Sequence, residues 1–467
     1  MTAILALDLG TSNLKVAAFD TRGREVAVRS TPTPKVGDGL LDAKTMAIRC
    51  EQLIKTLVAD LPSGCRIEAV VLSTAMHSIG LFDTGSEALT PLMLWNNDSA
   101  GELGQSLRGS AKATDWYKRS GVPVHGMSPM VKLLWLRDAK PELWAQTQSV
   151  AGIKEYLWHR WFGVWESDRS TASATGLMNL EKAVWDLVLL RAAGLEMHQL
   201  PHLVSTSHCR AFNVRIASRL GLEPGTPCFI GASDGALANL GSGAVDAGQA
   251  AVTIGTSAAL RVVSHKPVLD KSMRTFCYRV DEHRFIAGGA SNNGGNAMAW
   301  FHEKILNGQV SLDELTREAA KISPGSEGLL FAPYLEGERA PVWDAGARAS
   351  WTGLSAAHGR GHFTRSIMEG VMFNLKLIAE SIENQMEIDV LYAGGGFINN
   401  KLWVRMLADI LDKPVILPTQ NIDASIYGAV MLARNSLGLN AMQDLKTKQL
   451  LPNKARAMQY RFFFERF

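Results

Sequence analysis

The tripeptide Gly-Thr-Ser occurs twice in the chain, at residues 10–12 and 255–257, and each copy stands between two aliphatic stretches. Aliphatic stretches that are interrupted by glycine and hydroxyl residues favour β-hairpins, so we predict the same hairpin at both places. A tight turn of this kind directs backbone N–H groups and hydroxyls at one point, which creates an anion site. Two such turns facing each other across a cleft would hold a polyphosphate from both sides. The repeat therefore predicts a phosphotransferase with two domains.

Asp8 precedes the first turn at the end of an apolar run, whereas Thr253 takes the corresponding place before the second turn. A carboxylate next to an anion site is favourable when a cation lies between them, and Mg²⁺ on a nucleotide is the natural candidate. The alternative is that Asp8 stabilises the turn itself. Lys15, which follows the first turn, could reach a phosphate as a point charge or could simply be solvated.

Asp234 lies between an expected strand at 227–231 and a helix of small residues at 236–240. Ligands of α/β sheets gather at such strand ends. In a kinase the acceptor hydroxyl needs a carboxylate that takes its proton, and we predict Asp234 as this base, with a helix cap as its alternative role. A glycine run at 394–396 would let a flat ring approach the backbone closely, although a triple glycine is also a common loop.

The elements that must position these residues alternate between strands and helices. We expect a helix from its cap at Asp42 to about Leu61 and a buried strand at 67–73. A later helix at 363–385 would precede a strand at 390–393, and its buried stripe would consist of Ile367, Val371, Leu375, Ile378 and Ile382. This alternation predicts an α/β protein with covered sheets.

Length and composition limit the remaining possibilities. A chain of 467 residues is longer than a single hydrophobic core usually supports, so two domains are expected. The repeat places the boundary near 241–246, which gives domains 1–243 and 244–467. The net charge of +3 is dispersed, so nucleic acid is not an expected partner. Five scattered cysteines without CxxC spacing favour a reducing cytoplasm over disulfides or zinc, and neither a signal peptide nor a membrane segment is expected.

Two longer motifs resemble the signatures of the FGGY carbohydrate kinase family, whose two domains each have a ribonuclease H-like, actin-type core around a central cleft. The first motif has Ala139 where a polar residue is usual, and it is otherwise similar through Met127, Pro129, Lys132, Leu133, Trp135, Leu136 and Asp138. The second motif keeps the family's spacing through Ala349, Trp351, Gly353, Leu354, His362, Phe363 and residues 366–369. The resemblance covers nearly the whole chain.

The resemblance implies ATP and Mg²⁺ as cofactors. It implies that Asp8 and Asp234 place the metal and that Asp234 is the catalytic base. It assigns phosphate contacts to both domains and an adenine pocket to the second domain, with these residues as the expected contacts: Thr11, Ser12, Lys15, Gly255, Thr256, Gly395 and Asn399.

The acceptor sugar is expected to contact Met76, His77, Trp95 and Asp234. The stretches 76–78, 152–156, 172–177 and 292–295 look most like the gluconate kinase branch, which implies phosphorylation of D-gluconate to 6-phospho-D-gluconate. The stretch 95–99 lacks the Asp and Arg expected after the tryptophan and looks closer to xylulose kinases. His77 could instead be a satisfied core histidine, and the charged segment 336–344 could line the sugar cleft or form an internal salt-bridge network.

A xylulose kinase or another pentulose or polyol kinase is therefore the runner-up function. A rival from another class is a nucleotide-switched module without sugar kinase activity, because actin-type folds also serve chaperones and filaments. The expected partners are a small sugar or sugar acid and ATP, without nucleic acid or membrane. The sequence leaves the oligomeric state open, with a homodimer as one expectation.

Overall fold

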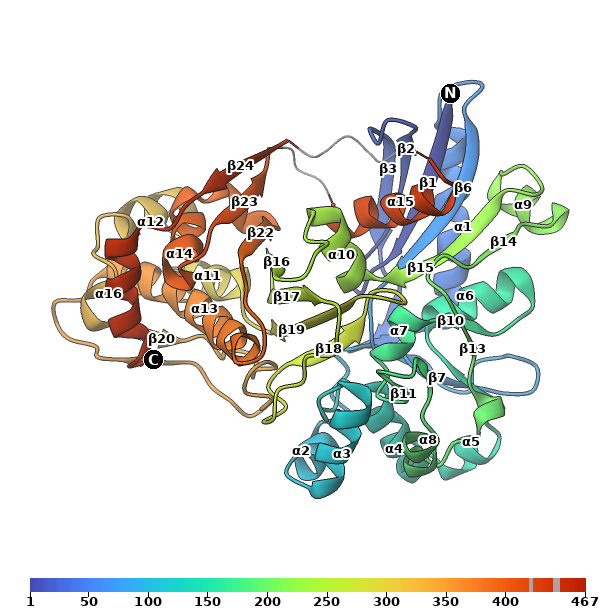
Figure 1. The fold of residues 1–467 in the computed structure, drawn as a ribbon, viewed down its shortest axis with the longest axis horizontal. Coiled ribbons are helices and arrows are strands. Elements are labelled where there is room, and N and C mark those ends of the chain that lie inside the picture. Colours follow the sequence, from blue (N-terminus) through green and yellow to red (C-terminus); the bar gives the residue numbers. More distant parts are fainter. Residues whose placement is uncertain (420–422, 440–445) are drawn as a thin grey trace.

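The structure is a computed structural model that describes residues 1–419, 423–439 and 446–467. Two large mixed sheets occupy opposite sides of the molecule (Figure 1). The first sheet contains, in spatial order, β14 (Cys209–Ala211), β15 (Pro227–Ser233), β6 (Arg66–Thr74), β1 (Thr2–Leu9), β2 (Asn13–Asp20) and β3 (Glu25–Pro32). The second contains β18 (Phe276–Arg279), β19 (Phe285–Ser291), β17 (Ala258–Ser264), β16 (Gln249–Ile254), β22 (Val390–Gly394), β23 (Val415–Pro418) and β24 (Thr447–Leu450).

The two sheets repeat one pattern of strand pairing. In the first, β1 pairs with β2 in antiparallel and with β6 in parallel orientation, and β6 pairs in parallel with β15. In the second, β16 pairs with β17 in antiparallel and with β22 in parallel orientation, and β22 pairs in parallel with β23. Both predicted hairpins are therefore confirmed, with Leu9 opposite Leu14 and Ile254 opposite Ala258 at their ends.

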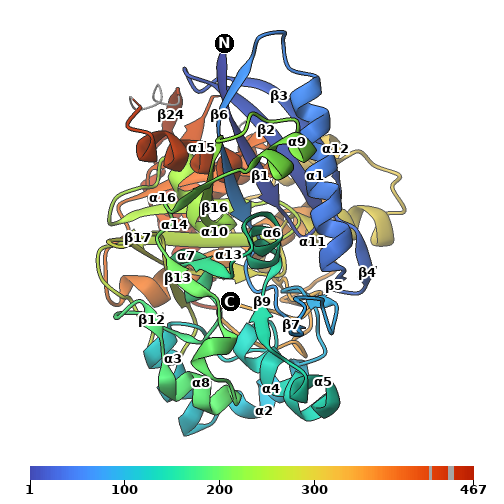
Figure 2. The ribbon, with the colours of Figure 1, turned by 90° about the vertical axis from the view of Figure 1, so that its right-hand side faces the viewer.

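Alternation along β1 determines what covers each face of the first sheet. Leu5 and Leu7 pack in the core that contains α1 (Ala43–Ala59), whereas Ile4 and Ala6 pack in the core that contains α15 (Ala424–Ser436). The long helix α1 runs along the outside of this sheet (Figure 2). Asp42 is its cap, as expected, because the carboxylate accepts a hydrogen bond of 2.7 Å from the backbone N–H of Thr45.

Two crossing helices connect the sheets. Helix α10 (Asp234–Ser242) follows β15 and packs against α15, which belongs to the second half of the chain but packs on β1 and β6 of the first sheet. Figure 1 shows α10 between the sheets and α15 over the strands of the first sheet. Each half therefore contributes a helix to a shared central core, which also includes Ile286 of β19 and Val263 of β17.

The remaining elements form two outer regions. Most of residues 79–208 surround a separate core below the first sheet, with β7 (Gly80–Phe82), β8 (Leu92–Met93), α2 (Gly101–Arg108), α3 (Ala111–Ser120), α4 (Pro129–Ala139), α5 (Pro141–Ala145), β9 (Ser149–Ala151), β10 (Glu166–Asp168), α7 (Arg169–Ser173) and α8 (Leu187–Ala193) among the elements of this region. Helix α6 (Ile153–Phe162) packs instead in the core between α1 and the first sheet. The second sheet is flanked by α11 (Gly295–Trp300), α12 (Leu312–Ala319), α13 (Arg360–Glu383), α14 (Lys401–Leu411) and α16 (Lys454–Phe464). The expected apolar stripe of α13 is buried throughout. In the described ranges, no helix is both long and apolar enough to cross a bilayer.

Candidate active site

A polar pocket of about 160 Å³ lies between the two sheets. Its lining comes from both halves of the chain: Ala75, Met76, His77, Trp95, Met127, Asp234, Ser257, Ala258, Ala259, Arg261, Phe276, Tyr278, Ala290 and Arg339. All four residues that the sequence predicted to contact an acceptor, namely Met76, His77, Trp95 and Asp234, are in this set. The structure therefore brings them together in one cavity.

Asp234 is the first residue of α10, directly after β15. The cap of this helix is Ser233, whose hydroxyl accepts a hydrogen bond from the backbone N–H of Ala236, so Asp234 is not needed for capping. One carboxylate oxygen of Asp234 accepts a hydrogen bond of 2.7 Å from the N–H of Gly235. Burial raises the pKa of Asp234 above its usual range, while the nearby Arg261 opposes that rise.

Asp8 lies near Asp234, at the end of β1. It accepts a hydrogen bond of 2.6 Å from the hydroxyl of Ser73 on β6, the parallel neighbour of β1. Burial raises the pKa of Asp8 to about 7, the Ser73 hydrogen bond opposes the rise, and the negative charges of Asp234 and Asp423 add to it. Several carboxylates crowded in this way favour a bound cation that would relieve their repulsion.

The first turn adjoins the same pocket. The indole N–H of Trp95, which follows β8, donates a hydrogen bond of 3.0 Å to the hydroxyl of Thr11. Ser12 is exposed next to it. Lys15 forms an ion pair with Asp423, the residue that caps α15, so its ammonium is paired with a carboxylate rather than simply solvated.

His77 and Trp95 are held by a buried lysine. The ammonium of Lys132 on α4 donates hydrogen bonds to the backbone carbonyls of His77 at 3.0 Å and Leu94 at 2.7 Å, with a longer contact of 3.4 Å to Met93. Lys132 has no exposed surface, and burial lowers its pKa well below the usual range. Neutral carbonyl oxygens thus bind this ammonium, and the two loops are fixed relative to each other.

Arg261 is a pocket residue that sequence reasoning did not identify, whereas Arg339 was expected there only as part of the charged segment 336–344. Arg261 lies on β17, on the same face as Ser257 and Ala259, because side chains of a strand alternate. The same alternation, counted from the second turn, could have identified Arg261 from the sequence. Arg339 reaches the pocket from the segment 336–344, and its guanidinium lies 4.5 Å from the centre of the Trp95 ring.

The neighbour of Arg339 has a different role. Glu338 is 1% exposed and accepts hydrogen bonds from the hydroxyl of Ser291 at 2.7 Å and from the backbone N–H of Asn292 at 2.8 Å. The charged segment therefore lines the polar pocket through Arg339, which was one of the two alternatives. Glu338 belongs to an internal network of hydrogen bonds from neutral groups, which differs from the salt-bridge network of the other alternative.

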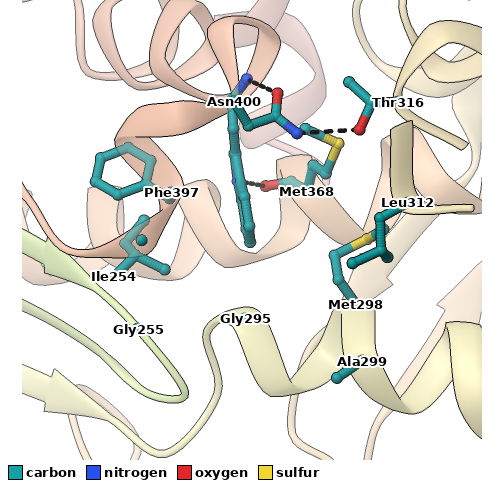
Figure 3. Close-up of a pocket in the computed structure, with 12 residues that line it drawn as sticks. Ile254, Gly255, Gly295, Met298, Ala299, Leu312, Thr316, Met368, Phe397 and Asn400 are labelled. Atoms are coloured by element: carbon teal, nitrogen blue, oxygen red, sulfur yellow. Dashed lines mark hydrogen bonds between the residues drawn. The ribbon is translucent and has the colours of Figure 1, made fainter. Parts of the chain in front are cut away.

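A second, apolar pocket of about 270 Å³ lies in the second half of the chain (Figure 3). Its wall consists of Ile254, Gly255, Gly295, Met298, Ala299, Leu312, Thr316, Met368, Gly396, Phe397, Asn400 and Trp403. The amide N–H of Asn400 donates a hydrogen bond of 3.0 Å to the hydroxyl of Thr316, and the amide oxygen caps α14. The pocket is thus a mainly apolar slot with polar groups at one end.

The predicted residues Gly395 and Asn399 stand directly before two residues of this wall, Gly396 and Asn400, and are not themselves in its lining. Gly395 has a φ of 90°, and a Cβ there would lie 2.5 Å from the carbonyl oxygen of Ile254. Only glycine allows this close approach of two backbones. The glycine run therefore brings its loop onto the second turn.

The second turn separates the two pockets. Gly255 lines the apolar pocket, and Ser257 lines the polar pocket. Thr256 stands between them, and its carbonyl accepts a hydrogen bond of 3.1 Å from the N–H of Asn296. A molecule that filled both cavities would have to pass this turn.

Across the ranges 1–419, 423–439 and 446–467, no three His, Cys, Asp or Glu side chains form a metal site on their own. Mg²⁺ usually keeps several waters and binds one or two carboxylates together with substrate phosphates. The crowded oxygens of Asp8 and Asp234 fit this mode of binding.

The chain matches known proteins along most of its length. The family model described as the N-terminal domain of the FGGY family of carbohydrate kinases matches residues 3–241, and the corresponding C-terminal domain matches residues 250–436. A gluconokinase from Bacillus subtilis (strain 168) is 33% identical over 482 residues, which cover 98% of this chain and 93% of the relative.

Solved structures agree with this fold. A gluconate kinase from Lactobacillus acidophilus has a TM-score of 0.94 at 32% identity and covers 99% of this chain and 96% of its own. A ligand-bound xylulose kinase from the same species has the same TM-score and identity, with 100% and 96% covered. The expected pair of ribonuclease H-like, actin-type domains around a cleft is confirmed. The chain belongs to the FGGY family of carbohydrate kinases.

Proposed function

We propose that this protein transfers the γ-phosphoryl group of ATP to a sugar acid and that its acceptor is D-gluconate, which becomes 6-phospho-D-gluconate. The observation that carries the proposal is the position of the second turn between an apolar slot and a polar pocket that contains Asp234. A nucleotide in the slot would extend its phosphates past Thr256 toward an acceptor in the polar pocket. The identity of 33% to a gluconokinase supports the choice of acceptor.

Asp234 would accept the proton of the acceptor hydroxyl as the phosphoryl group arrives. The raised pKa that burial gives this carboxyl favours its role as a base. When bound, Mg²⁺ would neutralise charge on the phosphates, and Asp8 and Asp234 are the residues that would hold it. The backbone groups of both turns would position the phosphates, with Lys15 leaving or sharing Asp423 to contact them.

The apolar pocket suits a flat adenine ring. Ile254, Met298 and Phe397 supply apolar surface, and Asn400 with Thr316 supplies polar groups at one end. The five cysteines are all free thiols, which supports a cytoplasmic location.

Phosphorylation of D-xylulose is the second candidate. Its support is specific: Ser99 stands where an arginine was expected in gluconate kinases, and a xylulose kinase is as similar in structure as a gluconate kinase.

An acceptor panel tests the proposal. Release of ADP is measured with gluconate, xylulose, ribulose, fuculose and glycerol, and we expect strong stimulation by gluconate alone. The Asp234→Asn variant should lose about a hundredfold or more of turnover with little change in ATP affinity, which is the scale of acid-base catalysis. Turnover without any polyol would instead support a nucleotide-switched module, and preference for xylulose would replace gluconate as the acceptor.

A further inference from the structure

Arg261 brings a positive charge to the polar pocket. Its Nε and Nη1 atoms are buried and have no hydrogen-bond partner in the part of the chain that the structure describes. Within the described ranges, no carboxylate lies within 4 Å of its guanidinium, although Asp234 is near enough to influence its pKa. Burial lowers the pKa of Arg261, but an arginine side chain stays charged in proteins. Buried guanidinium N–H groups without an acceptor are unfavourable, so this site favours a ligand that supplies acceptors and negative charge.

The other arginine of the pocket is already satisfied. Arg339 donates from Nε to the amide oxygen of Asn292 at 2.7 Å and from Nη2 to the carbonyl of Ser291 at 3.0 Å. Its guanidinium also lies over the ring of Trp95. The contrast shows that burial in this pocket does not by itself deprive an arginine of partners.

Tyr278 adds a second unsatisfied group beside Arg261. Its side chain is fully buried, and its hydroxyl has no hydrogen-bond partner among the described residues. The ring stacks on Phe276 with a centroid distance of 4.3 Å and an interplanar angle of 2°, so it is rigidly held. Arg261 and Tyr278 influence each other electrostatically and both line the pocket.

The chemistry of these donors identifies the missing group. A guanidinium only donates hydrogen bonds, and a phenol can donate one. A hydroxyl of a neutral sugar could accept one of these bonds but would leave the charge unbalanced. A carboxylate accepts several bonds and supplies the negative charge, and it matches the planar guanidinium.

We propose that Arg261 and Tyr278 form a carboxylate subsite, through which the enzyme selects sugar acids over neutral sugars. This inference rests on the proposed kinase function and locates the specificity within it. It also explains how a gluconate kinase could lack an arginine at Ser99: the positive charge comes from the second domain, from β17.

D-Gluconate and D-glucitol provide the test, because they differ only in a carboxylate and a hydroxymethyl group at one end. We expect Arg261→Gln to lower the ratio of kcat/KM for gluconate to that for glucitol by about a hundredfold. Tyr278→Phe, which preserves the stacked ring, should lower this ratio by about tenfold. Arg29→Gln is the matched control, since Arg29 is an exposed residue of β3 paired with Asp60, and it should leave the ratio unchanged.

Calorimetric titration of gluconate without nucleotide gives a second measurement, in which Arg261→Gln should weaken binding by a similar factor. If Arg261→Gln lowered kcat/KM equally for gluconate and glucitol, the subsite would be wrong, because Arg261 would then act through Asp234 or the phosphoryl group. The proposed kinase function would not be affected by that result. If another sugar acid proved to be the acceptor and its kcat/KM depended on Arg261, the choice of gluconate would be wrong but the carboxylate subsite would be supported. If the best acceptor were a neutral sugar, both proposals would fail.

Discussion

His77 is a neutral hydrogen-bonding residue in the polar pocket. Burial lowers its pKa to about 3, and the positive charge of Lys132 contributes. Its Nδ1 lies 2.9 Å from the carbonyl oxygen of Ala174. Because a carbonyl can only accept, Nδ1 carries the hydrogen and Nε2 keeps a lone pair. His77 is therefore suited to accept a hydrogen bond from a sugar hydroxyl at neutral pH.

This state of His77 makes stability depend on pH. An unfolded histidine binds a proton near pH 6.5, whereas the folded one does so only near pH 3, so stability is lost as the pH falls below 6.5. At pH 5 the loss from this residue should be about 2 kcal/mol. His77→Asn should lack it, and asparagine tolerates the positive φ of 70° at this position.

Denaturant unfolding of both proteins at pH 7 and pH 5 measures this difference. Other titrating groups are common to both proteins and cancel in the comparison. An equal loss of stability on acidification in the variant and the parent would show that His77 is protonated in the folded protein.

The sequence allowed Asp234, His77 and Trp95 to be placed in one site because each follows a recognisable strand or motif. Arg261 could have been found by strand alternation, but its lack of a partner depends on tertiary packing. The role of Lys132 could not be inferred from the sequence either. A lysine within a family signature suggests chemistry, yet its ammonium binds backbone carbonyls and fixes the loops of His77 and Trp95.

At the scale of elements, the crossing of α10 and α15 depends on two glycines. A Cβ on Gly241 would lie 1.8 Å from the carbonyl oxygen of Ala424, and one on Gly428 would lie 1.9 Å from that of Leu237. Both atoms belong to helix backbones, so no side chain could move aside. The two helices approach this closely because neither has a side chain at the contact.

We expect Gly428→Ala to destabilise the protein by about 3 kcal/mol, because the helices must separate to admit the methyl group. Thermal or denaturant unfolding measures this effect. Gly109→Ala is the control: Gly109 is exposed, has a φ of −77°, and a Cβ there would meet no atom within 4 Å. Unfolding of Gly428→Ala at the same midpoint as Gly109→Ala would mean that the crossing is loose.

The crossing also shows which parts of the fold local patterns could not predict. The hairpins, the cap of α1 and the buried stripe of α13 follow from neighbouring residues, and the structure confirms them. The position of α15 on the first sheet does not. Its apolar residues would suit either sheet, and only the topology brings this helix of the second half onto the first sheet.

At the scale of the whole molecule, ligand binding and domain closure should be coupled. The polar pocket takes Met76, His77 and Trp95 from one half of the chain and Arg261 from the other. An acceptor that contacts both halves would stabilise a closed arrangement, with α10 and α15 as the connection about which the halves move. Closure would exclude water from the phosphoryl group and so suppress ATP hydrolysis.

Solution X-ray scattering tests this coupling. With a non-hydrolysable ATP analogue and gluconate together, we expect a smaller radius of gyration than with either ligand alone. The reason is that each ligand alone contacts mainly one side of the turn at residues 255–257, whereas the pair would occupy both pockets. Glucitol in place of gluconate should close the molecule less, because it cannot pair with the charge of Arg261 on the second half. A gluconate titration under the same conditions confirms that the sites are saturated. If the radius of gyration of the ternary complex then equals that of the free protein, the pocket is already closed without ligands.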